Sequence, residues 1–521
     1  MTKLNNPSHH HRDRTPIALA VILACYVLLG ALYAWQTPLW QTPDEPAHFN
    51  YVRYLAEENR LPVLQYGDYP HEYLEEIKAA RFPPSMSIAP LRYESHQPPL
   101  YYVLAAVVYR ATAGLGADLR ILILRLFSVL LGAAALWVTY QVVRTSFPEH
   151  PFVSLAATAF VATVPMHLAM TAAINNDALA ELLLALLLWQ AVRTIREGLD
   201  RRRALAMGIL MGLVLLTKTT VYVVGAGVVL LAASSKQQAR SSGRQYAVAA
   251  DSQKPTIARR AGLWARVQYL AVVVGVAALI ALPFFVRNAL VYGGLDILGW
   301  QRHDSIVAGQ LRTSELIAQI GLPGFLQRLG LTTFRSFWAQ FGWMGVLVDE
   351  RIYLALALWS ALLAAGVAMA LLRLWRGRRR VNAAQGRILL LLAAAIGLTL
   401  LTYLGYNLKF VQHQGRYLFA ALGPLGVAAA FALRELLRPR TARLGTAMLL
   451  LGCAVLGVHG IVAGHVFLWG MLLLLAATAF LASAGWLTVG QPWAHAALLY
   501  GALLGLDWIC LFNYLVPALR L

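Results

Sequence analysis

The sequence predicts an all-α polytopic membrane protein with about 13 transmembrane helices. Composition is the first observation behind this class: the 521 residues are 59% hydrophobic and 13% charged, with a mean hydropathy of +0.59. Soluble domains contain about 25% charged residues. The second observation is that apolar stretches of roughly 20 residues, the length that crosses a bilayer, recur along the whole chain.

The third observation is the distribution of the basic residues along the chain. The formal net charge is +20, but the Arg and Lys residues occur in short runs between apolar segments. This distribution is typical of cytoplasmic loops, so nucleic-acid binding is not expected. The runs are residues 193–203, 372–380 and 434–443.

The three cysteines, Cys25, Cys453 and Cys510, lie within apolar segments and share no motif, which argues against a disulfide framework or a thiolate metal site.

Fourteen apolar segments are candidates for membrane spans. The first, residues 16–35, has no small-residue cleavage site after it and is expected to be a retained span rather than a signal peptide. The candidates are 16–35, 99–115, 121–143, 152–172, 178–195, 204–217, 220–234, 267–286, 352–372, 388–406, 417–434, 443–463, 466–486 and 494–515.

Loop charge predicts the orientation of these spans. With the basic N-terminus inside, the loop 36–98 lies outside, and its nine acidic residues outnumber five basic ones. A spanning segment 99–115 would place the basic loops 193–203 and 235–266 outside, against the positive-inside rule. We therefore expect 99–115 to lie along the outer surface as an interfacial helix. Thirteen spans remain, with the N-terminus cytoplasmic and the C-terminus outside.

Two external segments, 36–98 and 287–350, are long enough to cover a site, and the second is rich in aromatic residues and glycine. The polar segment 235–266 is expected to be a flexible cytoplasmic loop. This topology brings polar residues from distant parts of the chain to one face of the membrane. They are Asp44, Glu45, His96, Asn175, Asn176, Asp177, Lys218, Arg287, Arg335 and Arg416.

The stretch TPDEPAHF begins at Thr42, directly after the first span. Thr42 as N-cap, Pro43 at the first helical position and Glu45 at the third would form a capping box, which gives Glu45 a structural role. Asp44 needs no such role, and the helix dipole favours its ionised form, which can accept a proton. His48 follows one turn later and can face Asp44. Spacing alone leaves both a solvated helix start and a catalytic carboxylate open.

The stretch ESHQPPLYY, residues 94–102, contains a diproline that fixes an extended bend, as a membrane re-entry turn requires. His96 could alternatively hydrogen-bond a substrate. It could also join Asp44 and His48 around a divalent ion, although these three ligands lack a diagnostic spacing.

A polar cluster opens the apolar segment 178–195. An N-cap accounts for one polar residue, but three follow one another here: Asn175, Asn176 and Asp177. Glu181 lies one turn further, where acidic residues are costly and usually functional or paired. Lys218 lies between two short apolar runs, where it either extends to the interface or binds an anionic headgroup.

Basic residues also occur in the turn 407–416, where the charge rule predicts few of them. Lys409, His413 and Arg416 share this turn, and a planar guanidinium suits the paired oxygens of a phosphate. Arg287 and Arg335 belong to the same outward-facing cationic set. Neither a Walker nor a Rossmann motif occurs, so a cytosolic nucleotide substrate is not expected.

Four strings occur in one order on this face: PDEPAHF, HQPPLYY, NDAL and QGRYL. Together they resemble the GT-C-fold membrane glycosyltransferases, which include the dolichyl-phosphate-mannose protein mannosyltransferases and the bacterial lipid A aminoarabinose transferases. The resemblance is nearest to a bacterial branch that shares all four motifs, and it covers roughly residues 16–436. It implies a GT-C-like catalytic membrane module over 1–436, juxtamembrane helices in the first external loop, and C-terminal helices over 437–521. The long soluble C-terminal domain of some relatives has no counterpart, so the acceptor is not implied.

The resemblance implies an inverting glycosyltransferase at the outer face of a bacterial inner membrane, transferring a sugar from a polyprenyl-phosphate donor to an acceptor hydroxyl. Asp44 would be the general base. The full set of expected site residues has three parts. Catalytic residues are Asp44, Glu45 and Asp177; donor-phosphate residues are Lys218, Arg287 and Arg416; further substrate contacts are His48, His96, Asn176 and His413.

The chemistry of this reaction agrees with such a set. A phosphate leaving group needs charge neutralisation rather than a proton, and a single displacement needs one essential carboxylate, unlike the pair in a glycosidase. The expected partners are a lipid-linked sugar, a glycan, lipid or protein acceptor, and membrane lipids; a divalent cation is left open as cofactor. Two alternatives stand beside this function: a transporter or flippase of lipid-linked glycans, and a surface-polysaccharide polymerase or ligase.

Overall fold

The computed structural model describes residues 15–234, 255–377, 381–487 and 492–520. In its first half the helices are α1 Thr15–Gln36, α2 Glu45–Glu58, α3 His71–Ala79, η1 Tyr93–His96, α4 Leu100–Ala111, α5 Ala117–Ser146, α6 Pro151–Ala162, α7 Pro165–Thr171, α8 Asp177–Glu197, α9 Arg201–Leu215, η2 Thr219–Val221, α10 Tyr222–Ala233 and α11 Pro255–Tyr292.

The second half adds further helices and one short antiparallel hairpin of two strands. These elements are α12 Trp300–Ile306, α13 Thr313–Trp338, β1 Gln340–Phe341, β2 Val346–Leu347, α14 Glu350–Trp375, α15 Ala383–Asn407, η3 Gly415–Ala421, α16 Leu422–Leu436, α17 Pro439–Ala463, α18 Leu468–Ala482, η4 Ser483–Leu487, α19 Pro492–Ile509, η5 Cys510–Leu515 and α20 Val516–Leu519.

The helices confirm an all-α polytopic membrane protein. Within the described ranges, ten helices are long and apolar enough to cross a membrane, or eleven if α6 and α7, bent by 67° at their junction, count as one span. The other two of the thirteen expected spans, 204–217 and 220–234, correspond to the shorter helices α9 and α10. The count of thirteen is therefore consistent with the structure.

Small residues let the central helices approach closely, as is common in membrane bundles. On α9, a Cβ added to Gly208 would lie 2.9 Å from the Val273 carbonyl oxygen of α11. On α16, a Cβ on Gly426 would lie 2.7 Å from the Ala157 carbonyl oxygen of α6. A side chain at either position would force these helices apart.

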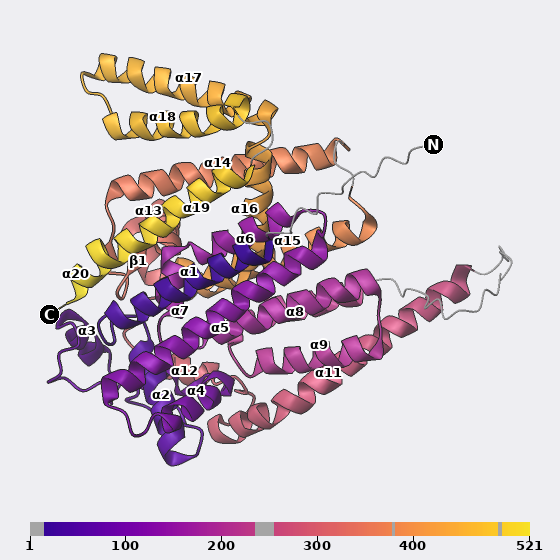
Figure 1. Ribbon diagram of the computed structural model, residues 1–521. Coiled ribbons are helices and arrows are strands. Elements are labelled where there is room, and N and C mark those ends of the chain that lie inside the picture. The colour runs from indigo at the N-terminus through magenta and orange to yellow at the C-terminus, as the bar shows by residue number, and fades with distance from the viewer. Residues whose placement is uncertain (1–14, 235–254, 378–380, 488–491, 521) are drawn as a thin grey trace, which may run out of the picture.

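The segment 99–115 forms α4, which is 12 residues long. It packs against α2 and α5, as an interfacial helix would. Figure 1 shows α2, α3, α4 and α12 gathered at one end of the molecule, while α8, α9 and α11 extend toward the other. We call the first of these ends the α2–α4 end.

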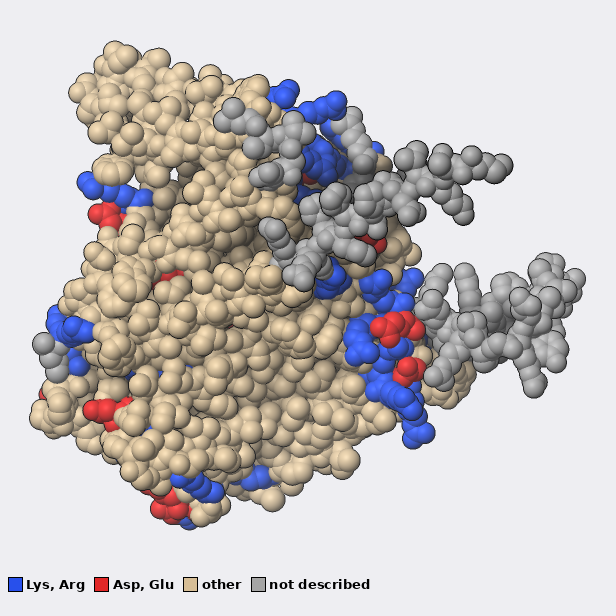
Figure 2. Space-filling view, viewed as in Figure 1, with Lys and Arg blue, Asp and Glu red and all other residues tan. Residues whose placement is uncertain are grey.

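Charged side chains are rare over the middle of the molecule and gather at its ends (Figure 2). Many of the basic ones visible at the right-hand edge lie where α8 and α9 meet, and exposed examples are Arg193, Arg201 and Arg202. This arrangement follows the expected enrichment of basic residues on one side of the membrane.

The expected flexible loop 235–266 needs correction. Residues 235–254 lie outside the described part of the chain, but the backbone of 255–266 is the beginning of α11, a helix of 38 residues. Basic and small residues are good helix formers, so the helix continues beyond its apolar part. The external segment 287–350 is likewise structured, as α12, α13 and the hairpin; α13 is kinked at Gly321, where φ is +70°.

Candidate active site

Asp44 is the residue from which α2 begins. It is the N-cap and has a left-handed backbone, with φ 68° and ψ −7°. The expected capping box from Thr42 to Glu45 is wrong, because Glu45 is the first helical residue and the Thr42 carbonyl instead accepts the Glu45 backbone N–H at 3.2 Å. Left-handed non-glycine residues are uncommon and concentrate at functional sites.

The Asp44 carboxylate is held by two partners. Its Oδ2 lies 2.5 Å from a guanidinium nitrogen of Arg416, and its Oδ1 accepts the Tyr93 hydroxyl at 3.0 Å. Burial alone would raise the pKa of Asp44, but the Arg416 charge and hydrogen bond, with His48 and Tyr93, hold it below its usual value. These contacts favour the ionised carboxylate, and its side chain remains 24% exposed.

Glu45, the adjacent acidic residue, faces a different environment. Both of its oxygens accept hydrogen bonds from the Arg125 guanidinium, at 2.7 and 2.6 Å, and the Ile174 backbone N–H donates to Oε1 at 3.2 Å. The Glu45 and Arg125 side chains are 0% and 2% exposed. This buried bidentate pair fastens α2 to α5, and such geometry indicates a structural role for Glu45 rather than the expected catalytic one.

The polar residues before α8 form a second cluster. Lys218 Nζ lies 2.7 Å from Asp177 Oδ1 and donates to Asn176 Oδ1 at 3.0 Å. The Asn175 side chain in turn accepts the Asp177 backbone N–H at 2.9 Å. Asp177 also lies close enough to Arg416 to raise the pKa of that guanidinium by charge attraction. Lys218, Asp177, Arg416 and Asp44 thus form a series of alternating charges.

A polar cavity of about 640 Å³ opens beside Asp44 at the α2–α4 end. Its walls come from the start of α2, from α3, η1, α12, α13, the β-hairpin and the turn before η3. Its charged and histidine side chains are Asp44, His71, Glu75, Lys78, Glu94, His303, Arg328 and Arg416. Its aromatic side chains are Tyr69, Tyr93, Trp343, Tyr406 and Tyr417. A space of this size and polarity suits a small carbohydrate.

Like Lys218, the expected basic residues Arg287, Arg335 and His413 do not line this cavity. Arg287 donates to the backbone carbonyls of Leu61 and Pro62 and stacks over a tyrosine, so it fastens the first long segment. Arg335 pairs with Glu350 at 2.5 Å. His413 is buried against Phe325, with neither ring nitrogen hydrogen-bonded within the described residues. The expected phosphate role of Arg287 has no support in this geometry.

The proposed metal ligands are also dispersed. His48 Nδ1 is 2.8 Å from the Tyr102 hydroxyl, while the His96 ring packs against His303, with 4.5 Å between ring centroids. Burial lowers the pKa of His96 to about 4 and that of His303 to about 3. No group of three or more His, Cys, Asp or Glu residues in the described ranges could hold a metal ion, so Asp44, His48 and His96 do not form the trio considered from the sequence.

Among the cavity residues that the sequence reasoning missed, Glu94 and Arg328 are two charged examples. Glu94 lines the cavity with Oε2 unpartnered among the described atoms, and burial raises its pKa above the usual value. Its position beside His96 in ESHQPP was the available signal. Arg328 lies on α13 in no recognisable motif, so only the fold places it at the site.

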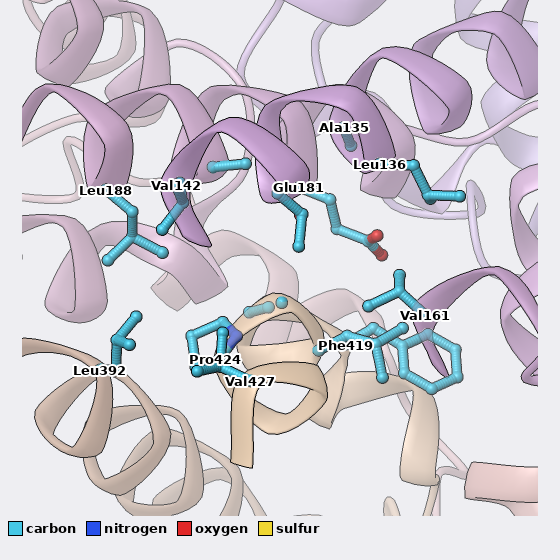
Figure 3. A pocket seen from close by; sticks show the side chains of 15 residues that line it. Ala135, Leu136, Val142, Val161, Glu181, Leu188, Leu392, Phe419, Pro424 and Val427 are labelled. Atoms are coloured by element: carbon cyan, nitrogen blue, oxygen red, sulfur yellow. The ribbon is translucent and has the colours of Figure 1, made fainter. Parts of the chain in front are cut away.

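Glu181 lies apart from the cavity, within the bundle. Its carboxylate is 2.9 Å from His167 Nε2, so it is paired, as the cost of an acid in a span requires. Figure 3 shows the Glu181 side chain extending into a narrow gap beside Leu136, Val161 and Phe419. The gap measures only about 30 Å³, which is room for a water molecule and too small for a substrate.

Residues 96–251 match the family model described as dolichyl-phosphate-mannose-protein mannosyltransferase. The matched range contains HQPPLYY and NDAL, two of the four motifs, and confirms over these residues the superfamily that the motifs resemble. A search of curated proteins finds no match.

The solved structures that this chain is similar to include those of two other proteins. One is ArnT from Cupriavidus metallidurans bound to undecaprenyl phosphate, with 16% identity, a TM-score of 0.47, and coverage of 96% of this chain and 73% of that chain. The other is the Archaeoglobus fulgidus oligosaccharyltransferase tethered with an acceptor peptide, with 15% identity and a TM-score of 0.49. In the second case the match covers 95% of this chain and 55% of the other.

Proposed function

We propose that the protein is an inverting glycosyltransferase that moves a sugar from a polyprenyl-phosphate donor to an acceptor hydroxyl at the outer face of a bacterial inner membrane. One observation carries the proposal: Asp44 and Arg416, separated by most of the chain, meet at 2.5 Å on the wall of a polar cavity at one membrane end. The family match over residues 96–251 supports the lipid-linked sugar chemistry.

Asp44 is the base in this mechanism. The acceptor hydroxyl gives its proton to the Asp44 carboxylate while its oxygen forms a bond to the anomeric carbon. The bond from that carbon to the phosphate oxygen breaks, and the electron pair leaves with the phosphate. One essential carboxylate suffices, because the phosphate departs without protonation and needs only cationic partners.

Arg416 connects the two halves of the reaction. Its Nε is buried and has no hydrogen-bond partner among the described residues, so it can donate to a phosphate oxygen. A bound phosphate would share the guanidinium charge that now lies against Asp44. The carboxylate would then gain proton affinity when the donor is present, which couples base strength to donor binding.

The Lys218–Asp177 pair has a secondary role in the proposal. Lys218 is already paired with Asp177 at 2.7 Å. It would therefore act on the phosphate through long-range electrostatics, together with the other charges of the series, rather than by direct contact. Asn176 keeps the ammonium in place by accepting its hydrogen bond. The acceptor hydroxyl and the sugar would occupy the aromatic-lined part of the cavity.

The test is sugar transfer by purified full-length protein, Asp44→Asn against Asp304→Asn. Asp304 pairs with Lys409 and Arg312 and does not line the cavity, so it is a matched control. We expect Asp44→Asn to lose at least 100-fold in turnover and to unfold as the parent does, while Asp304→Asn remains active. Normal transfer by Asp44→Asn would refute the base assignment. Movement of the lipid-linked glycan across vesicles without transfer would favour a flippase instead.

A further inference from the structure

The turn between β1 and β2 lines the polar cavity with two residues, Trp343 and Met344. Both have a left-handed backbone, with φ of 47° and 69°. This conformation is costly for any residue with a Cβ atom, and it is a true outlier for a bulky one. Glycine or asparagine would fit the turn with less strain, so the chain retains a tryptophan here at a cost to its backbone.

Two more segments with left-handed residues, 40–44 and 81–82, meet at Trp343. Its Nε1 donates to the Trp40 carbonyl at 2.9 Å, and its ring stacks on Phe82 with 5.9 Å between centroids and 20° between planes. Six of the seven left-handed residues other than glycine in the described ranges belong to these three segments: Trp40, Asp44, Arg81, Phe82, Trp343 and Met344. Strained backbone concentrates at active sites and ligand clamps, so this convergence indicates that Trp343 contacts a ligand.

An ion pair lies beside the indole on the same wall. Lys78 Nζ is 5.3 Å from the Trp343 ring centroid and 2.5 Å from Glu75 Oε1, and all three side chains line the cavity. The pair has no net charge but offers a donor and an acceptor, and the indole remains partly exposed. A hydrocarbon chain on this wall would bury the ion pair away from water, which is costly, and a phosphate would face Glu75. A saccharide fits the wall, because its C–H groups contact an aromatic ring while its hydroxyls bond to the ammonium and the carboxylate.

We propose that Trp343, with Lys78 and Glu75, forms the acceptor subsite and that the acceptor is a saccharide. The inference rests on the function proposed above and narrows its acceptor from a glycan, lipid or protein to a glycan. In an inverting displacement, the acceptor oxygen and the leaving phosphate lie on opposite sides of the anomeric carbon. The phosphate is assigned to Arg416 on η3, so we expect the acceptor at a wall to which η3 does not contribute. Residues of α3 and of the hairpin form such a wall, in the cavity that Asp44 also lines.

Three variants and one control test this wall. Trp343→Asn removes the indole without adding strain, because asparagine adopts a left-handed backbone more readily than most residues. Trp343→Phe keeps an aromatic face but loses the donor to the Trp40 carbonyl. Lys78→Gln removes the ammonium and leaves the indole in place. Trp375→Ala is the matched control, since Trp375 is 82% exposed and lines none of the spaces described above.

The experiment measures binding of maltose, cellobiose and chitobiose to full-length protein in nanodiscs by saturation-transfer NMR, with a peptide containing serine and threonine as the comparison ligand. We expect the parent to bind at least one disaccharide and not the peptide. Trp343→Asn should weaken binding of that disaccharide about tenfold, as truncation of an aromatic anchor does. Trp343→Phe should bind with intermediate affinity, Lys78→Gln more weakly than the parent, and Trp375→Ala as the parent does.

Three outcomes would overturn the inference: a parent that binds no disaccharide, preferential binding of the peptide, or normal disaccharide binding by Trp343→Asn. If Trp343→Asn does not fold, normal binding by both Trp343→Phe and Lys78→Gln overturns it instead. Sugar transfer by Asp44→Asn tests the proposed function separately. If the subsite fails but Asp44→Asn loses transfer, that function stands without an acceptor at Trp343. If disaccharide binding depends on Trp343 but the parent transfers no sugar, the function fails while the saccharide site stands.

Discussion

Replacing Arg125 with methionine should destabilise the protein by about 3–5 kcal/mol, the cost of leaving one partner of a buried ion pair without the other. Arg125 is 2% exposed, and its guanidinium donates two hydrogen bonds to Glu45. It also donates to the backbone carbonyls of Ala34, Thr37 and Pro38. Because all of these contacts are lost together, we place the expected value in the upper half of the range.

The measurement is the free energy of unfolding by SDS titration in mixed micelles, for Arg125→Met, Glu45→Gln and Asp44→Asn. Glu45→Gln should lose stability comparably, because it leaves the Arg125 charge buried. Asp44→Asn should lose less stability than Glu45→Gln, since the Asp44 side chain is 24% exposed and that of Glu45 is 0% exposed. A Glu45→Gln protein that is as stable as the parent but inactive would refute the structural role of Glu45 and restore it as a catalytic residue.

Two further predictions concern Arg416 and the histidine pair. Arg416→Lys keeps the charge but loses the planar set of donors; we expect turnover to fall at least tenfold, and, because the Arg416 contacts lower the pKa of Asp44, the acid limb of the pH–rate profile to move to higher pH. If the acid limb of the profile does not move, the group that titrates there is not Asp44. At His96, burial holds the pKa at about 4, so the unfolded chain takes up a proton near pH 6.5 that the folded chain takes up only near 4. Stability should therefore decrease as pH falls from 6.5 to 4, and His96→Phe should reduce this slope in thermal melts at matched pH; an identical slope would contradict the burial argument.

Much of the fold could be predicted because a bilayer imposes long apolar helices and separates charge by side. The loop charges alone led to the prediction that segment 99–115 lies along the surface rather than crossing the membrane. Asp44 and Arg416 could each be predicted on one face, but their contact could not, since it joins residues 372 positions apart. The hydrogen bonds from Arg287 to the Leu61 and Pro62 carbonyls could not be predicted either, because every residue has a backbone carbonyl and the sequence does not indicate which one accepts.

Glu45 shows a different kind of failure. Its partner Arg125 lies within the predicted span 121–143, and an arginine inside a span is itself a signal of a buried partner or a function. Attention to that residue could have suggested Arg125, rather than a capping box, as the partner of Glu45 before the fold was known. Arg328 offers no comparable signal, because only the fold places it on the cavity wall.

Because the backbone at Asp44 is left-handed, Asp44 and Glu45 face different surroundings, and the two acids could not exchange positions in the sequence. Because the chain turns at this residue, consecutive side chains diverge: one enters the cavity, and the next enters the interior and is clamped to α5. The backbone of Asp44 is thus one peptide bond away from an immobile anchor, while its carboxylate is oriented by Arg416 and Tyr93 of the cavity wall. Under the proposed function, substitutions elsewhere in the cavity wall would change which sugar is accepted while the backbone of the proposed base stays in place.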